Sequence, residues 1–496
     1  IRGRQRAVLS NISSSTAVEK ENRTRIVKPW KEIPGPSSLP LIGPLLNFLP
    51  GGFKGIQLSE QLYRLYGPIV RLDGMFGGQD MVLLFDPEAT KHVFRSEDPL
   101  PVRPGLPSLE YYRKHHNKTY DPKRLTGLVS DHGENWRELR SKVNPTMMQP
   151  KTIKLYTDVL VEVSNAMVAR LKSVRDENNK IAKNLDVEMN LWALESIGVV
   201  ALGTRLNCFD PNLAEDSPPK KLIQNVQNIF NIAEELDFGL SPWRLYSTPS
   251  FKKAMKIYEE HESLTKYFID QATKKIESKK NTYPIIEKPI LEKLLEIDVR
   301  IAEIMATDML FGGVDTVCAV VGTRLLHCIS WRKNPEKQKK LREEILAKQS
   351  RTPYLRACLK ESMRMLPVVN GGVRLSTKEY ILLGYKIPKD VTFSHHYMSL
   401  VEGNYPKPGE FIPERWLVDK EDPLYHGNTH PFVMAPFGFG VRMCIGRRIV
   451  ELELETLISK VIENFQIDWT SDEPIRIAPT SLNYITGPFH FIFKDY

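Results

Sequence analysis

The sequence predicts a mainly α-helical protein with a smaller β-rich part, and two observations support this fold class. Helical periodicity dominates residues 130–347, where Leu155, Val159, Val163 and Met167 repeat on one helix face. Short β-branched and aliphatic runs, bounded by glycine and proline, come before this stretch and return after it. The early runs predict a small sheet near the N-terminus. These strand-like runs are residues 69–72, 81–84, 380–383 and 489–493.

The composition is typical of a packed globular enzyme. Of the 496 residues, 41% are hydrophobic and 26% are charged, unlike a disordered or fibrous chain. The formal net charge of +9 suggests an acidic partner or membrane headgroups, but no nucleic-acid-binding module is recognisable, so nucleic acid is not expected as a partner. The five cysteines are scattered without a CxxC pair, which argues against a disulfide scaffold and indicates an intracellular protein.

Residues 1–33 are predicted to be a basic leader, and residues 34–496 a single folded domain. Five arginines and a serine run in the first 30 residues give a composition like that of an organelle transit peptide, with a disordered basic tail as the alternative. A Pro-Gly-Pro turn at 34–36 then marks the start of the folded body, because it cannot continue a helix. No stretch reaches roughly 18 uninterrupted apolar residues, so a bilayer-spanning helix is not expected.

Residues 437–446, a glycine-rich segment, present a cysteine as a candidate metal ligand. The segment reads Phe-Gly-Phe-Gly-Val-Arg-Met-Cys-Ile-Gly, and a helical pattern follows it from Arg447 to Ile458. The glycines let the backbone turn sharply against a flat cofactor, where any Cβ would collide. Cys444 ends that turn, so amide hydrogen bonds and the positive end of the following helix should favour its thiolate, the species that binds iron. A buried structural cysteine is the alternative.

This segment resembles the signature loop of the cytochrome P450 family, Phe-x-x-Gly-x-Arg-x-Cys-x-Gly, and the likeness extends over residues 34–488. The resemblance implies the cytochrome P450 fold, with a haem buried between a distal glycine-containing helix and the proximal cysteine loop. It also implies haem b, iron protoporphyrin IX, with Cys444 as the axial thiolate ligand of the iron. The other cofactor-binding residues expected in the loop are Phe437, Gly438, Arg442 and Gly446.

Glu361 and Arg364 belong to a Glu-Ser-Met-Arg stretch, whose i,i+3 spacing puts both charges on one helix face. By itself, this pattern suits a surface ion pair. In the family, an arginine from a later Pro-Glu-Arg-Trp stretch joins these two residues, and Arg415 holds that position here. The resemblance implies a buried triad with a structural role, which fixes the segment that carries Cys444.

Gly312 and Gly313 interrupt a helical pattern that runs over residues 299–330. Glycine within a helix costs about 1 kcal/mol relative to alanine, so the pair requires a reason, either close approach to a flat ligand or contact with another helix. In the family, this helix crosses the distal face of the haem. The resemblance implies that Thr316 and Asp315, which follow the glycines, are catalytic residues that deliver protons during the reduction of O₂.

Four residues are expected to hold the haem propionates, which are anionic and need partners with several hydrogen-bond donors. Trp136 and Arg140 match the Trp-x-x-x-Arg propionate contact of the family. Arg374 and Arg442 are the other cations at matching positions. Each arginine, taken alone, would be interpreted as a solvated surface residue.

The likeness is closest to the mitochondrial branch of the family, in particular to its arthropod members. That branch receives electrons from an adrenodoxin-type ferredoxin, a small acidic iron–sulfur protein served by an NADPH-dependent reductase. Two pairs of cations are predicted to bind it, Arg356 with Lys360 on one helix face and Arg447 with Arg448 after the ligand cysteine. A solvated helix face is the alternative.

The same branch implies a location on the matrix side of the mitochondrial inner membrane. Contact with the bilayer is expected to be peripheral, through an apolar patch for which residues 236–243 are a candidate, and a plain interhelical loop is the alternative. The protein is expected to be a monomer.

The activity implied by the resemblance is that of a haem-thiolate monooxygenase, which inserts one oxygen atom of O₂ into a lipophilic small molecule, either a xenobiotic or a steroid-like compound. The apolar composition of the expected pocket points to such a substrate, although it would equally suit core packing. The expected pocket residues are Phe311, Gly312, Val368, Val369 and Leu482.

Two other function classes are open. A haem-thiolate hydroperoxide isomerase needs neither O₂ nor a reductase, but such relatives usually lose the Thr316-type relay or enlarge the cysteine loop, and both features are intact here. A non-enzymatic haem electron carrier or sensor would need a second axial ligand. No histidine or methionine is clearly placed near Gly312 and Gly313, although Met309 is one helical turn away. Carbon monoxide difference spectra, followed by turnover with ferredoxin, separate the three classes.

Overall fold

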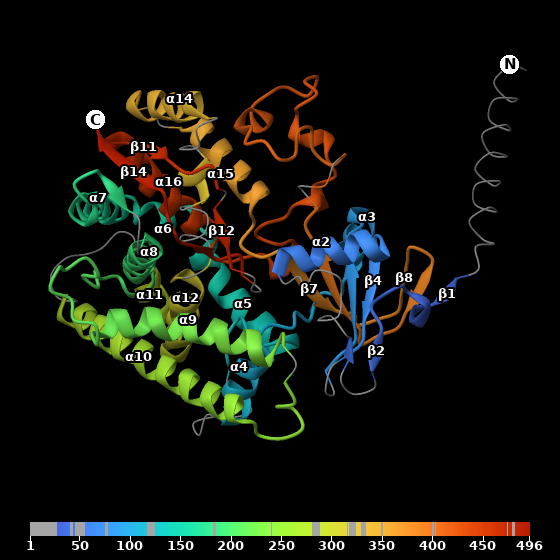
Figure 1. Cartoon of the computed structure of the whole chain (residues 1–496). Coiled ribbons are helices and arrows are strands. Elements are labelled where there is room, and N and C mark those ends of the chain that lie inside the picture. The colour runs from blue at the N-terminus through green and yellow to red at the C-terminus, as the bar shows by residue number, and fades with distance from the viewer. Residues whose placement is uncertain are drawn as a thin grey trace, which may run out of the picture.

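The computed structural model describes residues 27–39, 43–44, 55–74, 78–116, 125–181, 185–239, 241–279, 288–314, 316, 324–328, 334–348, 351–398, 401, 403–473, 475–478 and 482–496. Helices make up most of this described chain, which confirms the mainly α prediction (Figure 1). The helices are α2 (Gly55–Tyr66), α3 (Pro87–Ser96), α4 (Pro107–Tyr111), α5 (Gly133–Met148), α6 (Pro150–Lys154), α7 (Thr157–Val174), α8 (Leu185–Leu202), α9 (Pro218–Leu236), α10 (Pro249–Lys279), α11 (Ile290–Ile297), α12 (Val299–Val314), α14 (Pro335–Leu346), α15 (Pro353–Met365) and α16 (Arg447–Asn464).

Helix α8 lies at the centre of the helical body. Nearly all of its side chains are buried, because its sequence is apolar on every side. Helix α12 packs across it at Gly313, where an added Cβ would come within 2.4 Å of the Ile197 side chain. Helices α9 and α10 run side by side and also contact α12 (Figure 1). The sequence predicted that the α12 helix would continue to residue 330. The structure describes it to Val314 and describes 324–328 as helical again, and the residues between lie outside the described chain except for Thr316.

The main sheet joins segments from both ends of the chain, in the strand order β4-β5-β10-β7. The sequence placed the β-rich part near the N-terminus, and this placement was incomplete, since β5 pairs in parallel with β10 and β10 pairs antiparallel with β7. Such pairing depends on contacts more than 300 residues apart, for example Phe393 with Val82. The strands of this sheet are β4 (Ile69–Leu72), β5 (Met81–Leu84), β7 (Gly371–Leu375) and β10 (Thr392–His396).

Four smaller sheets complete the described fold, and most of their strands are short. The predicted strand at 380–383 is β8, and the one at 489–493 lies two residues further along, as β14. The three-stranded sheets have the orders β1-β9-β8 and β11-β14-β6, and the pairs are β2-β3 and β12-β13. The strands are β1 (Lys28–Pro29), β2 (Ser38–Leu39), β3 (Gly43–Pro44), β6 (Lys180–Ile181), β8 (Tyr380–Leu382), β9 (Tyr385–Ile387), β11 (Phe465–Trp469), β12 (Arg476–Ile477), β13 (Ile485–Thr486) and β14 (Phe491–Asp495).

The folded body begins earlier than the predicted boundary at residue 34. Strand β1 pairs in parallel with β9, and Ile33 is buried in the hydrophobic cluster under this sheet. The last residues assigned to the leader, from Lys28 onward, therefore belong to the fold. Among the described residues, none of the helices combines the length and the apolar character that a bilayer-spanning segment requires.

Candidate active site

Cys444 lies in a tight loop whose shape depends on glycine. Gly438 and Gly440 have φ angles of +73° and +72°, in the left-handed region that favours glycine. A 3-10 turn spans Gly440–Arg442, and the Cys444 N–H then donates to the carbonyl of Phe437 at 2.9 Å. Helix α16 begins immediately afterwards, with Gly446 as its N-cap. The loop thus holds the Cys444 thiol at the positive end of a helix, as the sequence predicted.

The surroundings of the sulfur act on its pKa in opposite directions. Burial raises the pKa of the Cys444 thiol, while the N–H groups of Gly446 and Arg447 and the charges of Arg103 and Arg140 act to lower it. Burial is the largest of these effects, and the amide donors act on the pKa in the direction that the sequence predicted. A bound metal cation deprotonates a coordinating thiol outright, and the donors that such a thiolate needs are already in place here.

The two glycines of α12 have different roles. Gly313 faces Ile197 and permits close packing of two helices, whereas a Cβ on Gly312 would meet no atom within 4 Å. Gly312 therefore borders open space, and only this glycine suits the approach of a flat ligand. The Thr316 hydroxyl donates to the Gly312 carbonyl at 2.5 Å. Asp315, the other residue predicted to be catalytic, lies outside the described residues.

Arg103 is a candidate site residue that sequence reasoning missed. Burial lowers the pKa of its guanidinium and the charge of Arg374 lowers it further, whereas Cys444 and Tyr397 act to raise it. Protein thus surrounds Arg103 beside Cys444, yet the side chain is exposed, and within the described chain it has no hydrogen-bond or ion-pair partner. A side chain that is both enclosed and accessible lines an internal space. No motif or spacing in the sequence marks it.

Arg140 lies beside the cysteine loop, as predicted. One of its terminal N–H groups donates to the Met443 carbonyl at 2.8 Å, and its Nε is buried with no partner among the described groups. Burial lowers the pKa of Arg140, and the Cys444 charge acts against this effect. An unpaired donor on a buried cation is costly unless an anion approaches it.

The other two predicted propionate cations are largely occupied by protein groups. Arg442 donates to the carbonyls of Pro101, Leu128 and Asp131 at 3.0 to 3.3 Å and contacts His132. It therefore ties the cysteine loop to the segment before α5.

Arg374 forms an ion pair with Glu97 at 2.7 Å and donates to the carbonyls of Val373 and Phe439. Arg374 thus contacts the cysteine loop through Phe439, but its charge is already paired with that of Glu97.

Trp136 is buried, and the guanidinium of Arg442 lies over its ring, 3.9 Å from the ring centroid. This contact is a cation–π interaction, which holds Arg442 in place. Trp136 was predicted to contact a propionate directly. The structure shows that its ring face supports an arginine, and the contact with a propionate stays a prediction.

Positive charge exceeds negative charge around this internal space. Burial, followed by the charges of Arg103, Arg374 and Arg140, lowers the pKa of Arg442 to about 9. Glu97 pairs with Arg374, which leaves Arg103 and Arg140 without a carboxylate among the described residues. A ligand with two carboxylates and a metal that takes a thiolate suits this arrangement. The residues present therefore fit haem b, with Cys444 holding the iron and Arg103 and Arg140 available to the propionates.

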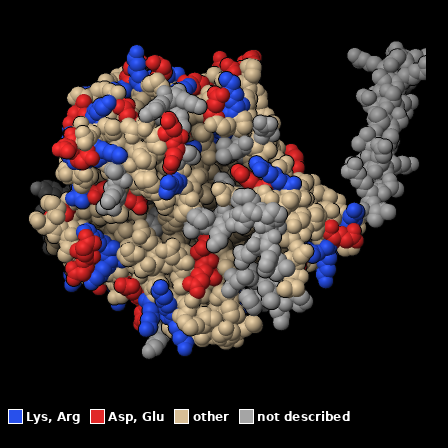
Figure 2. Space-filling view, viewed as in Figure 1, with Lys and Arg blue, Asp and Glu red and all other residues tan. Residues whose placement is uncertain are grey.

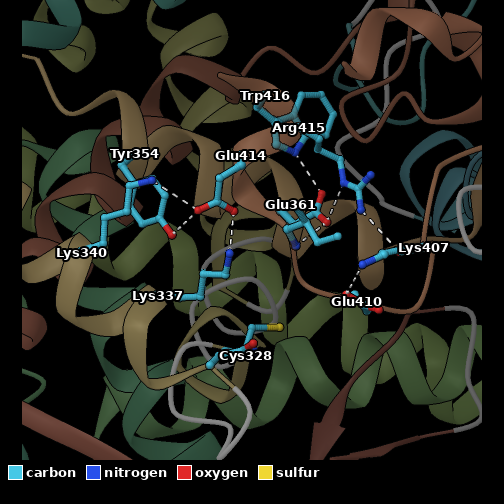
Figure 3. A network of polar contacts seen from close by, with 12 residues as sticks. Cys328, Lys337, Lys340, Tyr354, Glu361, Lys407, Glu410, Glu414, Arg415 and Trp416 are labelled. Atoms are coloured by element: carbon cyan, nitrogen blue, oxygen red, sulfur yellow. Dashed lines mark hydrogen bonds and ion pairs between the residues drawn. The ribbon is translucent and has the colours of Figure 1, made fainter. Parts of the chain in front are cut away.

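Glu361 of α15 is the centre of a buried polar network that includes the 3-10 turn Pro413–Trp416 (Figure 3). Its carboxylate accepts two hydrogen bonds from Arg364, at 2.8 and 2.9 Å, and one from Arg415 at 3.0 Å. Trp416 Nε1 and the Ile412 N–H also donate to it. All three charged side chains are fully buried. The structure thus brings together the three residues that the resemblance predicted as a triad.

The predicted substrate-pocket residues also come together. Val369 and Leu482 form an isolated antiparallel bridge, and the Asn483 N–H donates to the Val368 carbonyl at 2.8 Å. Phe311 of α12 stacks on Phe230 of α9 with ring centroids 5.1 Å apart. The Tyr484 ring contacts Phe230 edge to face. Aromatic groups of α9, α12 and the segment around Tyr484 therefore lie together, and Leu482 links this segment to Val369.

The four cations predicted to bind an acidic partner divide into two groups. Arg356 forms an ion pair with Glu455 at 2.7 Å, and Arg447 forms one with Glu451 at 2.9 Å. Lys360 and Arg448 are exposed, and within the described chain no carboxylate pairs with either. On the face shown in Figure 2, positive and negative side chains are interspersed.

Comparisons with known proteins agree with this geometry. A family model described as Cytochrome P450 matches residues 33–493. The chain is 36% identical to "Cytochrome P450 CYP12A2" of Musca domestica, over 98% of this chain and 94% of that protein. It is 35% identical to "Probable cytochrome P450 12a5, mitochondrial" of Drosophila melanogaster, over 94% and 91%. The solved structure of retinoic acid bound cyanobacterial CYP120A1 covers 95% of this chain with a TM-score of 0.72 at 17% identity, which supports the fold.

Proposed function

Because the chain belongs to the cytochrome P450 family, we propose that it inserts one oxygen atom of O₂ into a lipophilic small molecule, with electrons from an acidic, adrenodoxin-type ferredoxin. The observation that carries this proposal is the Cys444 thiol, held by amide donors beside two arginines that no carboxylate of the described residues neutralises. When bound through Cys444, haem supplies the reductive activation of O₂.

Thr316 would handle protons in this reaction. Its hydroxyl donates to the Gly312 carbonyl, which leaves the lone pairs of Oγ1 free to accept a hydrogen bond from a proton donor. Held in this way, the hydroxyl can orient a water molecule or an acid that supplies a proton to the reaction. The resemblance assigns Asp315 as the acid that supplies such protons.

The pocket supports a lipophilic substrate, either a xenobiotic or a steroid-like compound. Phe230 contacts both Phe311 and Tyr484, and Leu482, two residues before Tyr484, forms a bridge with Val369. An apolar wall with few polar groups favours a ligand that is itself mostly apolar.

Relatives named as mitochondrial support a mitochondrial location. Within the mitochondrion, we place the protein on the matrix side of the inner membrane, where it would meet the proposed ferredoxin. Peripheral membrane contact would use exposed apolar side chains in the connector between α9 and α10. Leu236 and Trp243, at the ends of the patch considered in the sequence, are buried, whereas Phe238, Leu245 and Tyr246 are exposed. These three side chains would lie in the interfacial region of the bilayer, and the protein would act as a monomer.

Incubation of the haem-loaded protein with ferredoxin, its reductase, NADPH and ¹⁸O₂ tests the proposed activity. One ¹⁸O atom is expected in each product molecule formed from a steroid or xenobiotic panel, measured by mass spectrometry. Thr316→Val keeps the shape of the side chain but removes the hydroxyl, so product per NADPH consumed is expected to fall at least about 10-fold. Product that carries oxygen only from an added hydroperoxide would contradict the proposal and support an isomerase.

If an acidic ferredoxin binds at Lys360 and Arg448, changing the charge of these residues should change the KM for ferredoxin. Reversal of each charge, as Lys360→Glu and Arg448→Glu, is expected to raise the KM for ferredoxin about 10-fold with little change in kcat, because rim charges act mainly on association. The effect should largely disappear at about 0.5 M salt, where exposed charges are screened.

A matched control is Lys253→Glu on α10, which lies at the opposite end of the molecule from α15 in Figure 1. This control should leave the KM for ferredoxin unchanged. Equal effects of all three reversals would show that net charge, and no local docking site, governs the association.

A further inference from the structure

Two asparagines form a clamp behind the predicted pocket wall. The Asn483 side-chain amide donates to the Pro367 carbonyl at 2.7 Å and to Asn370 Oδ1 at 2.8 Å. The Asn483 N–H also donates to the Val368 carbonyl, and the bridge between Val369 and Leu482 lies between these contacts. Asn483 is almost fully buried, whereas Asn370 is partly exposed.

The hydrogen bonds fix the orientation of both amide groups. A carbonyl oxygen can only accept, so the Asn483 atom 2.7 Å from the Pro367 carbonyl must be its nitrogen. That nitrogen also lies 2.8 Å from the side chain of Asn370, and the atom it meets there must therefore be the oxygen of Asn370. The Pro367 carbonyl can only accept a hydrogen bond, so it determines which atom of each asparagine amide is the donor and which is the acceptor.

The amide nitrogen of Asn370 is left free by this arrangement. Within the described chain, no group accepts a hydrogen bond from Asn370 Nδ2, and this atom is not among the buried polar atoms that lack partners. It therefore reaches accessible space, directly after Val368 and Val369 in the chain. Val368, Val369 and Leu482 next to it are apolar, so these two N–H groups are a polar feature beside apolar side chains.

We propose that Asn370 is a specificity-determining residue, whose amide N–H groups bind an oxygen atom of a mostly lipophilic substrate. Asn483 acts as a positioning residue, because it holds the Asn370 amide with its donors outward. The favoured ligand class is a lipophile with a carbonyl or ether oxygen, since a hydrocarbon would leave these donors unpaired. This inference rests on the proposed function, in that it assumes a lipophilic substrate in this pocket.

Matched ligand pairs that differ by one oxygen test this assignment. The haem-loaded protein is titrated with fluorenone and fluorene, and with camphor and bornane, and the dissociation constants are measured from the shift of the Soret band. In Asn370→Leu, the affinity for each ketone relative to its hydrocarbon is expected to fall about 3- to 10-fold, the range of one net hydrogen bond, with the hydrocarbon's own affinity little changed. Asn370→Asp should lose the same preference, because it keeps the acceptor for Asn483 but removes the donors.

Val369→Ala serves as the control, since a smaller apolar side chain should weaken the ketone and the hydrocarbon alike. Asn483→Leu is expected to reduce the ketone preference although it does not itself contact the ligand. A ketone preference that is unchanged in Asn370→Leu would overturn the proposal while leaving the proposed function intact. If no member of either pair shifted the spectrum of the parent protein, the lipophilic pocket itself would be contradicted, and this assignment with it.

Discussion

Replacement of Cys444 by serine is expected to abolish the thiolate-ligated pigment of this protein and its monooxygenase activity. Serine has nearly the same size and can accept the same N–H groups of Gly446 and Arg447, so the loop should keep its shape. Its hydroxyl, however, cannot replace the thiolate as an electron-rich ligand of iron. Activity should fall by more than about 100-fold. Mutation of a residue that only hydrogen-bonds to a metal ligand already lowers metal affinity or activity by about 10- to 100-fold.

The measurement is the difference spectrum of the reduced protein with carbon monoxide, together with the haem content after purification. Cys208→Ser is the matched control, because Cys208 is also a buried free cysteine but lies beside Glu195, in a different part of the fold. This control should retain the parent spectrum. An unchanged band in Cys444→Ser would mean that another residue holds the iron, and the assignment of the active site would fail.

Replacement of Glu361 by glutamine is expected to cost about 3 to 5 kcal/mol of folding stability. The carboxylate accepts five hydrogen bonds, and its loss would leave Arg364 and Arg415 as buried cations without a counter-charge. Since whole domains are stable by only about 5 to 15 kcal/mol, this change alone should remove much of the folded, haem-loaded protein. Thermal unfolding and the ratio of haem to protein measure the effect.

An exposed pair provides the control for this experiment. Arg137 and Glu134 also have i,i+3 spacing on a helix, but both side chains are more than half exposed. Arg137→Gln is expected to change stability by less than about 0.5 kcal/mol, because solvent screens such pairs. Similar losses of folding stability in both variants would contradict the structural role of the triad. Normal haem loading in Glu361→Gln would show that the triad is not needed to hold the cysteine loop in place.

The cysteine loop and the early strands were predictable because their signals are local. Gly438 and Gly440 adopt left-handed φ angles that glycine takes up readily, and the strands at 69–72 and 81–84 were predicted with the bounds that the structure gives them. The Glu361 network was predicted only through the family resemblance, since i,i+3 spacing alone describes an exposed pair as well as a buried one. The structure supplies the burial that separates the two cases.

Other features depend on contacts between distant segments, and no sequence pattern contains them. The enclosure of Arg103 beside Cys444 joins residues more than 300 positions apart, and the orientation of Asn370 depends on Asn483 and on one backbone carbonyl. The structure also pairs two of the four predicted docking cations with carboxylates, which leaves Lys360 and Arg448.

The sequence by itself indicated the mainly helical fold, the family and the cysteine that we propose as the iron ligand, because these follow from periodicity and from a short motif read along the chain. Only the tertiary structure decided which charges are neutralised, which glycine borders open space and which amide is left with free donors. Burial and partnering are properties of surroundings built from many segments, and they set the energy of each polar group far more than its place in the sequence does.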